Sequence, residues 1–251
     1  MRAIDVSPYR SGDREQIRRL CCDVAYAGQP LERWIDLDRE LFADLFTRYY
    51  TDFEPSSVFV ARDKDEVLGY VFACLNTARY RRVWRRHVVL PALGGIVTGR
   101  YALPWKGLPR LMNLGISYVR SGCLKVPWRR YPGHVHINTA PACRGRTTLS
   151  RALMHRAFDH FASHGVFRIH GVVMTSRARM LEKYERLGFK VDSSHGAARP
   201  DPKRNQAFWL VLTMDLAKGS LRPMESVHMR RRGTLRRKEP TISCSLPPSE
   251  A

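Results

Sequence analysis

Two histidines and an asparagine alternate with apolar residues in a stretch that could do proton-transfer chemistry. His134, His136 and Asn138 are separated by Val135 and Ile137. Residues two apart in a β-strand project from the same face of a sheet, and an imidazole titrates near neutral pH. We therefore predict a strand with three polar side chains on one face, in which His134 and His136 are candidate general bases and Asn138 orients water or substrate. Hydrogen-bonded structural residues would give the same pattern.

The distribution of carboxylates limits which groups can act as the base. No Asp or Glu occurs between Glu66 and Asp159, so the strand that carries the two histidines contributes no carboxylate. A second source of carboxylates is the aromatic-rich stretch 31–50, which we expect to be helical. The alternative bases on it are Glu32, Asp36, Asp38 and Glu40.

The residues that follow the polar strand predict an anion-binding junction. Pro141 and Gly145 interrupt the chain, and a helical pattern of apolar residues begins at Thr147, where Thr147 or Thr148 could cap the helix. The free N–H groups at a helix N-terminus attract phosphate. Nearby cations strengthen this prediction: Arg144, Arg146 and Arg151. A phosphate or pyrophosphate site at a strand-to-helix junction also suits other nucleotide-dependent enzymes.

The remaining elements predict an α/β fold around one sheet. Strands are expected at 3–6, 57–61, 67–75, 134–138, 166–174, 189–192 and 207–216, and the pair 57–61 and 67–75 should form an antiparallel hairpin. Helices are expected after Ser11 or Asp13, over 31–50, from Thr147, and from Ser176 to about Leu187. The predicted order is β-α-α-β-β-(insertion)-β-α-β-α-β-β, in a domain that covers residues 1–217.

Four stretches resemble the GNAT superfamily of N-acyltransferases. Arg144-Gly145-Arg146 leading into 149–153 is similar to its acetyl-CoA signature, and K-Y-E-R-L-G-F at 183–189 resembles its C-terminal motif. The opening I-D-V-S-P-Y-R-S-G-D with the two following helices, and the hairpin V-F-V-A…V-L-G-Y-V, resemble the family's N-terminal half. Thr147 and Leu149 stand where the family signature has glycines, and Arg177 where it often has Asn. The resemblance implies a GNAT-like mixed, mostly antiparallel central sheet flanked by helices.

The resemblance also implies a reaction and a set of site residues. It implies transfer of an acetyl group from acetyl-CoA, a cosubstrate, to a primary amine, by direct attack on the thioester and without a metal. Tyr184 takes the place of the tyrosine that protonates the departing thiolate. The implied cofactor-binding residues are Thr139, Ala140, Arg144, Gly145, Arg146, Thr147, Thr148, Leu149, Ser150 and Arg177.

Residues 77–132 form an insertion where the family usually has a short connection between strands. The segment holds twelve Arg and Lys residues and no Asp or Glu, with Tyr and Trp interleaved. Its prolines and glycines predict several short pieces rather than one element. We expect either an accessory lid whose aromatic residues complete the core, or a surface for an acidic substrate, nucleic acid or an anionic membrane.

The net charge of +20 indicates acidic partners without naming one. Residues 218–251 are basic and rich in Pro and Ser, so we expect a disordered tail in which 230–238 could act as a nuclear-import segment or simply as a solubilising one. No stretch has the length of a signal peptide core or a membrane span, which favours a cytoplasmic protein. The six cysteines lack metal-ligand spacing and should be reduced thiols: Cys21, Cys22, Cys74, Cys123, Cys143 and Cys244.

The sequence thus favours an N-acetyltransferase that acts on a small-molecule or protein amine. The alternative is a catalytically weak or inactive GNAT-fold binding protein that engages an acidic macromolecule or a membrane surface.

Overall fold

The computed structural model describes residues 5–33, 35–102, 126–143, 147–175, 184–185, 187–195 and 208–217. All of them lie in one unit, Met1–Leu221. The expected anion loop at 144–146, Arg177, most of the helix expected from Ser176 and the tail fall outside the described residues. No described helix is long and apolar enough to cross a membrane.

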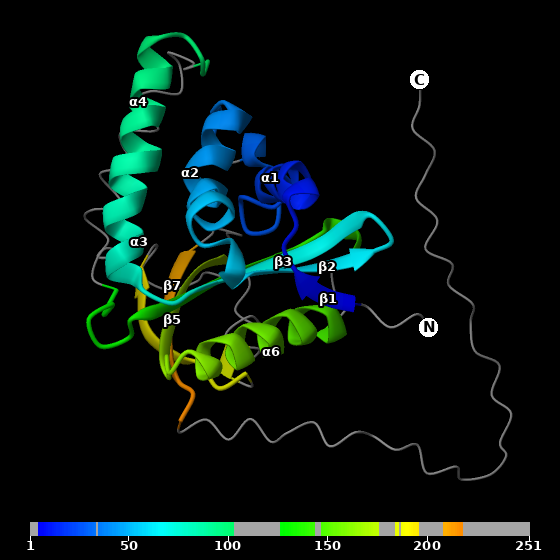
Figure 1. The fold of residues 1–251 in the computed structure, drawn as a ribbon, viewed down its shortest axis with the longest axis vertical. Coiled ribbons are helices and arrows are strands. Elements are labelled where there is room, and N and C mark those ends of the chain that lie inside the picture. The colour runs from blue at the N-terminus through cyan, green and yellow to red at the C-terminus, as the bar shows by residue number, and fades with distance from the viewer. Residues whose placement is uncertain are drawn as a thin grey trace, which may run out of the picture. The chain divides into compact units, whose positions relative to one another are not determined.

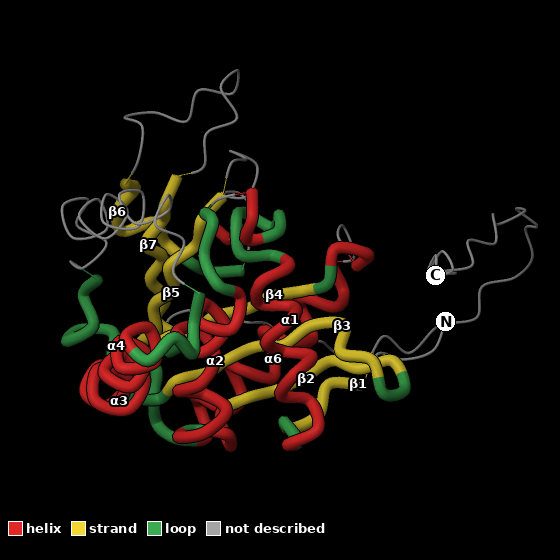
Figure 2. The backbone as a smooth tube through the Cα atoms, turned by 90° about the horizontal axis from the view of Figure 1, so that it is seen from above, coloured by secondary structure: helices red, strands yellow, loops and turns green. Residues whose placement is uncertain are grey.

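Seven strands form one sheet in the order β1-β2-β3-β4-β5-β7-β6 (Figure 2). Every neighbouring pair is antiparallel except β4 and β5, which are parallel. The predicted mixed, mostly antiparallel sheet is therefore confirmed, with strand ends that shift by a few residues. The strands are β1 Asp5–Pro8, β2 Val58–Asp63, β3 Glu66–Cys74, β4 Gly133–Thr139, β5 Arg168–Thr175, β6 Lys190–His195 and β7 Phe208–Asp215.

Helices cover both faces of the sheet (Figure 1). On one face, α1 (Arg14–Asp23) and α2 (Arg39–Phe53) pack on even-numbered β3 side chains such as Tyr70 and Phe72. On the other face lies α6 (Thr147–Ser163), whose residues Leu149, Leu153, Ala157 and Phe161 are fully buried. These four residues recur at helical spacing, which is why the apolar pattern predicted this helix correctly.

The starts of the first two helices differ from the sequence prediction. The first helix is not capped by the expected side chain, and the second begins later than expected. Asp13 precedes α1, but its carboxylate accepts from the N–H of Arg10 and pairs with Arg62 of β2 instead of capping the helix. The stretch 31–50 is not one helix, because a short 3-10 turn at Leu31–Arg33 is separated from the next helix by residues 35–38, which belong to no helix or strand. The helix starts only at Arg39, where the Asp38 side chain accepts from the N–H of Leu41.

The first part of the insertion forms one continuous helical run instead of the expected short pieces. The run consists of α3 (Thr77–Trp84), a π-helical turn (Arg85–Val89) and α4 (Leu90–Val97), and it rises beside α2 in Figure 1. Pro91 lies inside the run rather than ending it. A proline lacks an N–H and its ring crowds the carbonyl one turn earlier, so the widened π turn directly before Pro91 accommodates it.

Candidate functional site

Strands β4 and β5 pair only at one end, which opens the sheet between them. The parallel register joins Gly133 to Ile169 and His134 to His170, and no pairing of the two strands is recorded beyond these residues. Both strands continue, β4 to Thr139 and β5 to Thr175. Their later residues therefore flank a gap in an otherwise continuous sheet.

Backbone groups of β4 point into this gap. The N–H of Ala140 donates to the carbonyl of Leu68, so even-numbered residues of this stretch form the hydrogen-bonded pairs with β3. Because backbone groups alternate along a strand, the N–H and C=O of Ile137 and Thr139 point away from β3 and toward β5. They lie beyond the two paired residues, and no partner for them is found in the part of the chain that the structure describes, so a ligand that enters between the strands could bind them.

His134 is held by hydrogen bonds at both ring nitrogens. Its Nε2 lies 2.7 Å from the Tyr50 hydroxyl and its Nδ1 lies 2.9 Å from the hydroxyl of Thr77. The residue is buried, and this burial holds the pKa of His134 well below its usual value. The imidazole therefore stays neutral and joins α2, β4 and the first residue of α3.

His136 lies on the same face and is less constrained. Its Nε2 lies 3.2 Å from Nδ2 of Asn138, and this nitrogen lies 2.7 Å from the Tyr70 hydroxyl. Burial lowers the pKa of His136 to about 4. Nδ1 of His136 has no hydrogen-bond partner among the described residues. The predicted shared face is thus confirmed, and of its two histidines only His136 keeps a nitrogen available.

The N-terminus of α6 follows β4 after a short 3-10 turn at Pro141–Cys143 and residues 144–146. Leu149, which stands at a glycine position of the family signature, is fully buried in the core with Leu153 and Ala157. Its side chain therefore leaves the first turn of the helix clear on the outer side. Thr148 is exposed and Ser150 half-buried there.

Tyr184 lies on the α6 side of the sheet. It packs against the apolar cluster around β4 and α6, with its ring 6.3 Å edge-on from the ring of Phe189. Burial raises the pKa of Tyr184 to about 12. The hydroxyl is consequently protonated at neutral pH, as a proton donor must be. The sheet separates Tyr184 from His136, and β4 and β5 are not paired along the part of the sheet that carries His136.

No family model and no curated protein sequence matches the chain. Among solved structures, SsHAT superposes with a TM-score of 0.61 at 27% identity over 84% of this chain and 98% of that one. An enzyme described as a GCN5-related N-acetyltransferase, from Kribbella flavida, superposes at 0.48 with 18% identity over 85% and 98%. Naa20 of Chaetomium thermophilum, solved with a bisubstrate analogue, superposes at 0.46 with 16% identity over 85% and 87%.

The chain has the GNAT fold. The mixed, mostly antiparallel sheet and the helices that flank it agree with the architecture that the sequence resemblance implied. Of the predicted site residues, the structure describes Tyr184, His134, His136 and Asn138, together with Thr139, Ala140 and the start of α6 from Thr147 to Ser150.

Three of the four alternative carboxylate bases already have partners in the fold. Glu32 pairs with Arg39, which also pairs with Asp23. Asp38 caps α2, and its second oxygen accepts from the N–H of Ala102. Asp36 is exposed, and Glu40 pairs with Arg18. Each of the three partnered carboxylates serves the packing of α1, α2 or α4, so none is favoured over His136.

The sequence interpretation missed three residues around His134. Tyr50 and Thr77 bond its ring nitrogens, and Tyr80 of α3 lies with its ring 4.8 Å from the imidazole. All three are separated from His134 by more than fifty positions in the sequence. From the sequence, the aromatic residues of the insertion were expected either to complete the core or to form a binding surface, and only the fold shows which of them reach β4. The described residues contain no group of three or more His, Cys, Asp or Glu placed to hold a metal ion.

Proposed function

We propose that this chain is an acetyl-CoA-dependent N-acetyltransferase that moves an acetyl group to a primary amine. The observation that carries the proposal is the opening of the sheet beyond His134 and His170, with a helix N-terminus close behind the end of β4. In a GNAT fold this arrangement offers free strand backbone beside an anion-binding helix end. The amine belongs to a small molecule or a protein.

The chain's own groups suit acetyl-CoA. The backbone groups of Ile137 and Thr139 that face the gap can bind the amide-containing arm of the cosubstrate and polarise the thioester carbonyl. The N–H groups at the start of α6, from Thr147 to Ser150, can bind its pyrophosphate. Within the proposed cofactor site, Ala140 directly follows β4. The cationic residues Arg144, Arg146 and Arg177 and the intervening Gly145 lie outside the described residues.

The reaction needs a proton acceptor on one side of the gap and a proton donor on the other. The acceptor amine attacks the thioester carbonyl, so that a C–N bond forms and the C–S bond breaks. His136, neutral because its pKa is lowered to about 4, takes the proton that the amine loses, directly or through one water. The Tyr184 hydroxyl gives a proton to the departing thiolate and is reprotonated from solvent.

Asn138 decides which nitrogen of His136 is the base. With the amide nitrogen toward Nε2, the ring hydrogen sits on Nδ1 and the imidazole cannot accept there. Turning the amide by half a rotation places its oxygen beside both Nε2 and the Tyr70 hydroxyl, which then both donate to it. The hydrogen moves to Nε2 and Nδ1 becomes free. We assign this second arrangement to the reacting enzyme, with Asn138 as the positioning residue.

Isothermal titration of the full chain with acetyl-CoA, followed by a free-thiol release assay with a library of primary amines, tests the proposal. We expect saturable binding and amine-dependent thiol release that Tyr184→Phe reduces. Absence of acetyl-CoA binding at physiological concentration would contradict the enzyme. Binding without thiol release for any amine class would instead favour the inactive binding protein.

A further inference from the structure

The outer face of α4 carries a stripe of exposed aliphatic side chains. Leu90, Leu93 and Val97 are 62%, 53% and 86% exposed, and their spacing of three and four residues places them on one line along the helix. Gly94 beside them is also exposed. We call these three residues the α4 stripe. Single exposed leucines need no explanation, but three in line on a helix resemble half of a helix–helix seam.

The stripe is not available to the core of this chain. The opposite face of α4 is already packed, because Ala92 and Tyr101 are buried together with Leu41 of α2. The Tyr101 hydroxyl also donates to the buried carboxylate of Asp44, which pairs with Arg18 of α1. Turning the stripe inward would break these contacts. The helix is therefore fixed with its aliphatic line outward.

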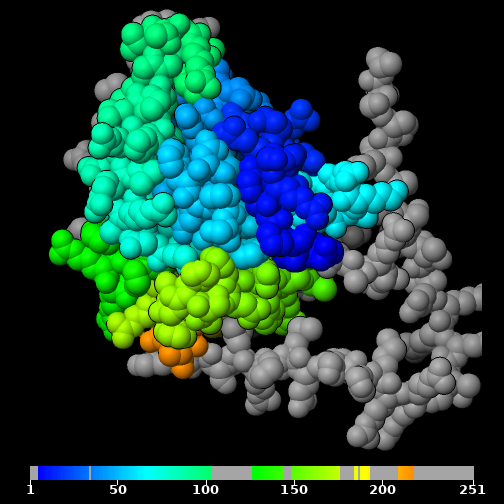
Figure 3. All heavy atoms as spheres, viewed as in Figure 1, coloured from blue at the N-terminus to red at the C-terminus, as the bar shows by residue number. Residues whose placement is uncertain are grey.

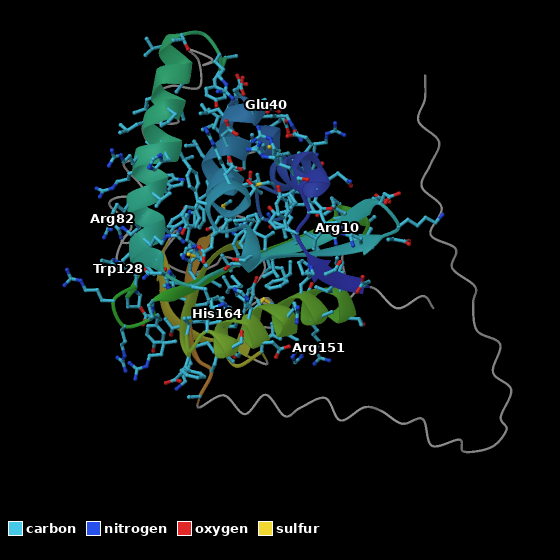
Figure 4. The ribbon with its side chains drawn as sticks, viewed as in Figure 1. Arg10, Glu40, Arg82, Trp128, Arg151 and His164 are labelled. Carbon is cyan, nitrogen blue, oxygen red and sulfur yellow. The ribbon has the colours of Figure 1, made fainter. Side chains whose placement is uncertain are left out.

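The part of the helical run that precedes Leu90, the first residue of the stripe, is strongly basic. The arginines of α3 and the π turn are all exposed, and Figure 4 shows Arg82 on the outward side of the run, with Trp128 near its base. Between Thr77 and Ala102 there is no Asp or Glu. Figure 3 shows this run as a continuous part of one face of the molecule. The exposed arginines are Arg79, Arg81, Arg82, Arg85 and Arg86.

We propose that the α4 stripe and these arginines form a docking surface for an acidic amphipathic helix of a partner protein. The apolar face of such a helix covers Leu90, Leu93 and Val97, and its carboxylates then meet the arginines one to three turns further along the run. Aliphatic contact supplies affinity, while opposite charge fixes the direction of the partner helix.

The charges and the aromatic residues argue against two other occupants. A second copy of this chain would bring the same run without a single carboxylate, so its arginines would face arginines or apolar groups. A membrane-surface helix usually buries aromatic residues at the interface. Here the aromatic residues of the run face inward, since Trp84 donates to the carbonyl of Leu45 and Tyr80 packs on His134.

Fluorescence anisotropy with a designed peptide tests the surface. The probe is a labelled helical peptide with leucines at heptad a and d positions and glutamates beside them, titrated with the full chain at physiological salt. We expect saturable binding that weakens by roughly tenfold or more in Leu93→Glu and in Arg86→Glu. The matched controls are Phe167→Glu for the apolar change and Arg19→Glu for the charge change, both at exposed positions outside the helical run. These controls should bind like the native chain.

Three results would overturn the proposal. One is no saturable binding of the peptide, or equal binding by the native chain and Leu93→Glu. A second is Leu93-dependent binding to phosphatidylserine vesicles in place of the peptide, which would assign the stripe to a membrane. The third is concentration-dependent self-association that Leu93→Glu abolishes, which would assign it to a second copy. None of these readouts uses acetyl transfer, so they do not depend on the proposed activity.

Discussion

His134 and His136 stand two residues apart on the same strand face, yet their neighbours give them different roles. His134 has a hydroxyl on each ring nitrogen, from Tyr50 and Thr77. Among the described residues, His136 has one side-chain hydrogen-bond partner, the amide of Asn138, and keeps Nδ1 available. Removing the first should affect the free energy of unfolding, whereas removing the second should affect the reaction.

This contrast gives a paired prediction. His134→Gln should lower the free energy of unfolding by about 1–3 kcal/mol, because it leaves buried hydroxyls without their partner. His136→Gln should keep most of the stability and reduce kcat by about 100-fold or more, because the base is lost. Urea unfolding and steady-state kinetics measure the two effects. An unchanged rate in His136→Gln would remove His136 as the base.

Tyr184 gives a second prediction at the residue scale. Tyr184→Phe should lower kcat by about 10- to 100-fold with little change in the affinity for acetyl-CoA, because only the proton donor is lost. Tyr9→Phe is a suitable control, since Tyr9 lies at the end of β1, where its N–H donates to the carbonyl of Val58 in β2. An equal loss in both variants would mean that the hydroxyl of Tyr184 has no special part.

At the scale of the element, the helical run α3 to α4 fixes one wall of the candidate site. Its first residue, Thr77, bonds His134 through its hydroxyl, and its N–H donates to the carbonyl of Pro132. At its other end, the N–H of Arg100 donates to the carbonyl of Gly95, and Tyr101 folds back to Asp44. The run is therefore anchored at both ends, and the wall keeps its position relative to β4.

Two adjacent glycines of α4 provide a matched test of the second anchor. A Cβ added at Gly95 would lie 2.5 Å from a ring carbon of Tyr101, whereas a Cβ at Gly94 would meet no atom within 4 Å. Gly95→Ala should therefore displace Tyr101 and destabilise the protein by about 1–3 kcal/mol. Gly94→Ala should stabilise it by up to about 1 kcal/mol through helix propensity. Thermal unfolding checks both signs, and stabilisation by Gly95→Ala would contradict the packing described for Tyr101.

At the scale of the whole molecule, buried neutral histidines couple stability to pH. Burial lowers the pKa of His136 and of His170 to about 4, and it holds the pKa of His134 well below its usual value. In the unfolded chain a histidine titrates near 6.5. As the pH falls from about 6.5 toward 4, the unfolded state therefore binds protons that the folded state refuses, and stability is lost.

We therefore predict that acid destabilises the protein and that His170 accounts for one measurable part of this loss of stability. Each such histidine contributes a slope of about 1.4 kcal/mol per pH unit between these limits. His170→Gln should reduce the pH dependence of the free energy of unfolding, relative to the native chain, by the equivalent of about one bound proton. Urea denaturation at several pH values between 4.5 and 7.5 measures both slopes. An equal slope in His170→Gln would place the acid sensitivity elsewhere.

Local patterns in the sequence were sufficient for most of the fold. Alternation of apolar residues predicted the strand at 134–138, helical spacing of Leu149, Leu153 and Ala157 predicted α6, and the polar turn after Arg62 predicted the hairpin of β2 and β3. These features depend on neighbours within one or two turns, so a single chain is enough to show them. The predicted start of α2 was wrong. The stretch holds several carboxylates, and the sequence does not show that Asp38 is the one that caps the helix.

What the sequence by itself determined was the set of chemical groups: two histidines and an asparagine on one strand face, an anion-binding helix start and a basic insertion. The tertiary structure decided how they can act. It separated β4 from β5 beyond His134, bonded that histidine through Tyr50 and Thr77, and turned Leu90, Leu93 and Val97 outward. Each of these outcomes depends on contacts between residues far apart in the chain, and local periodicity carries no information about such contacts.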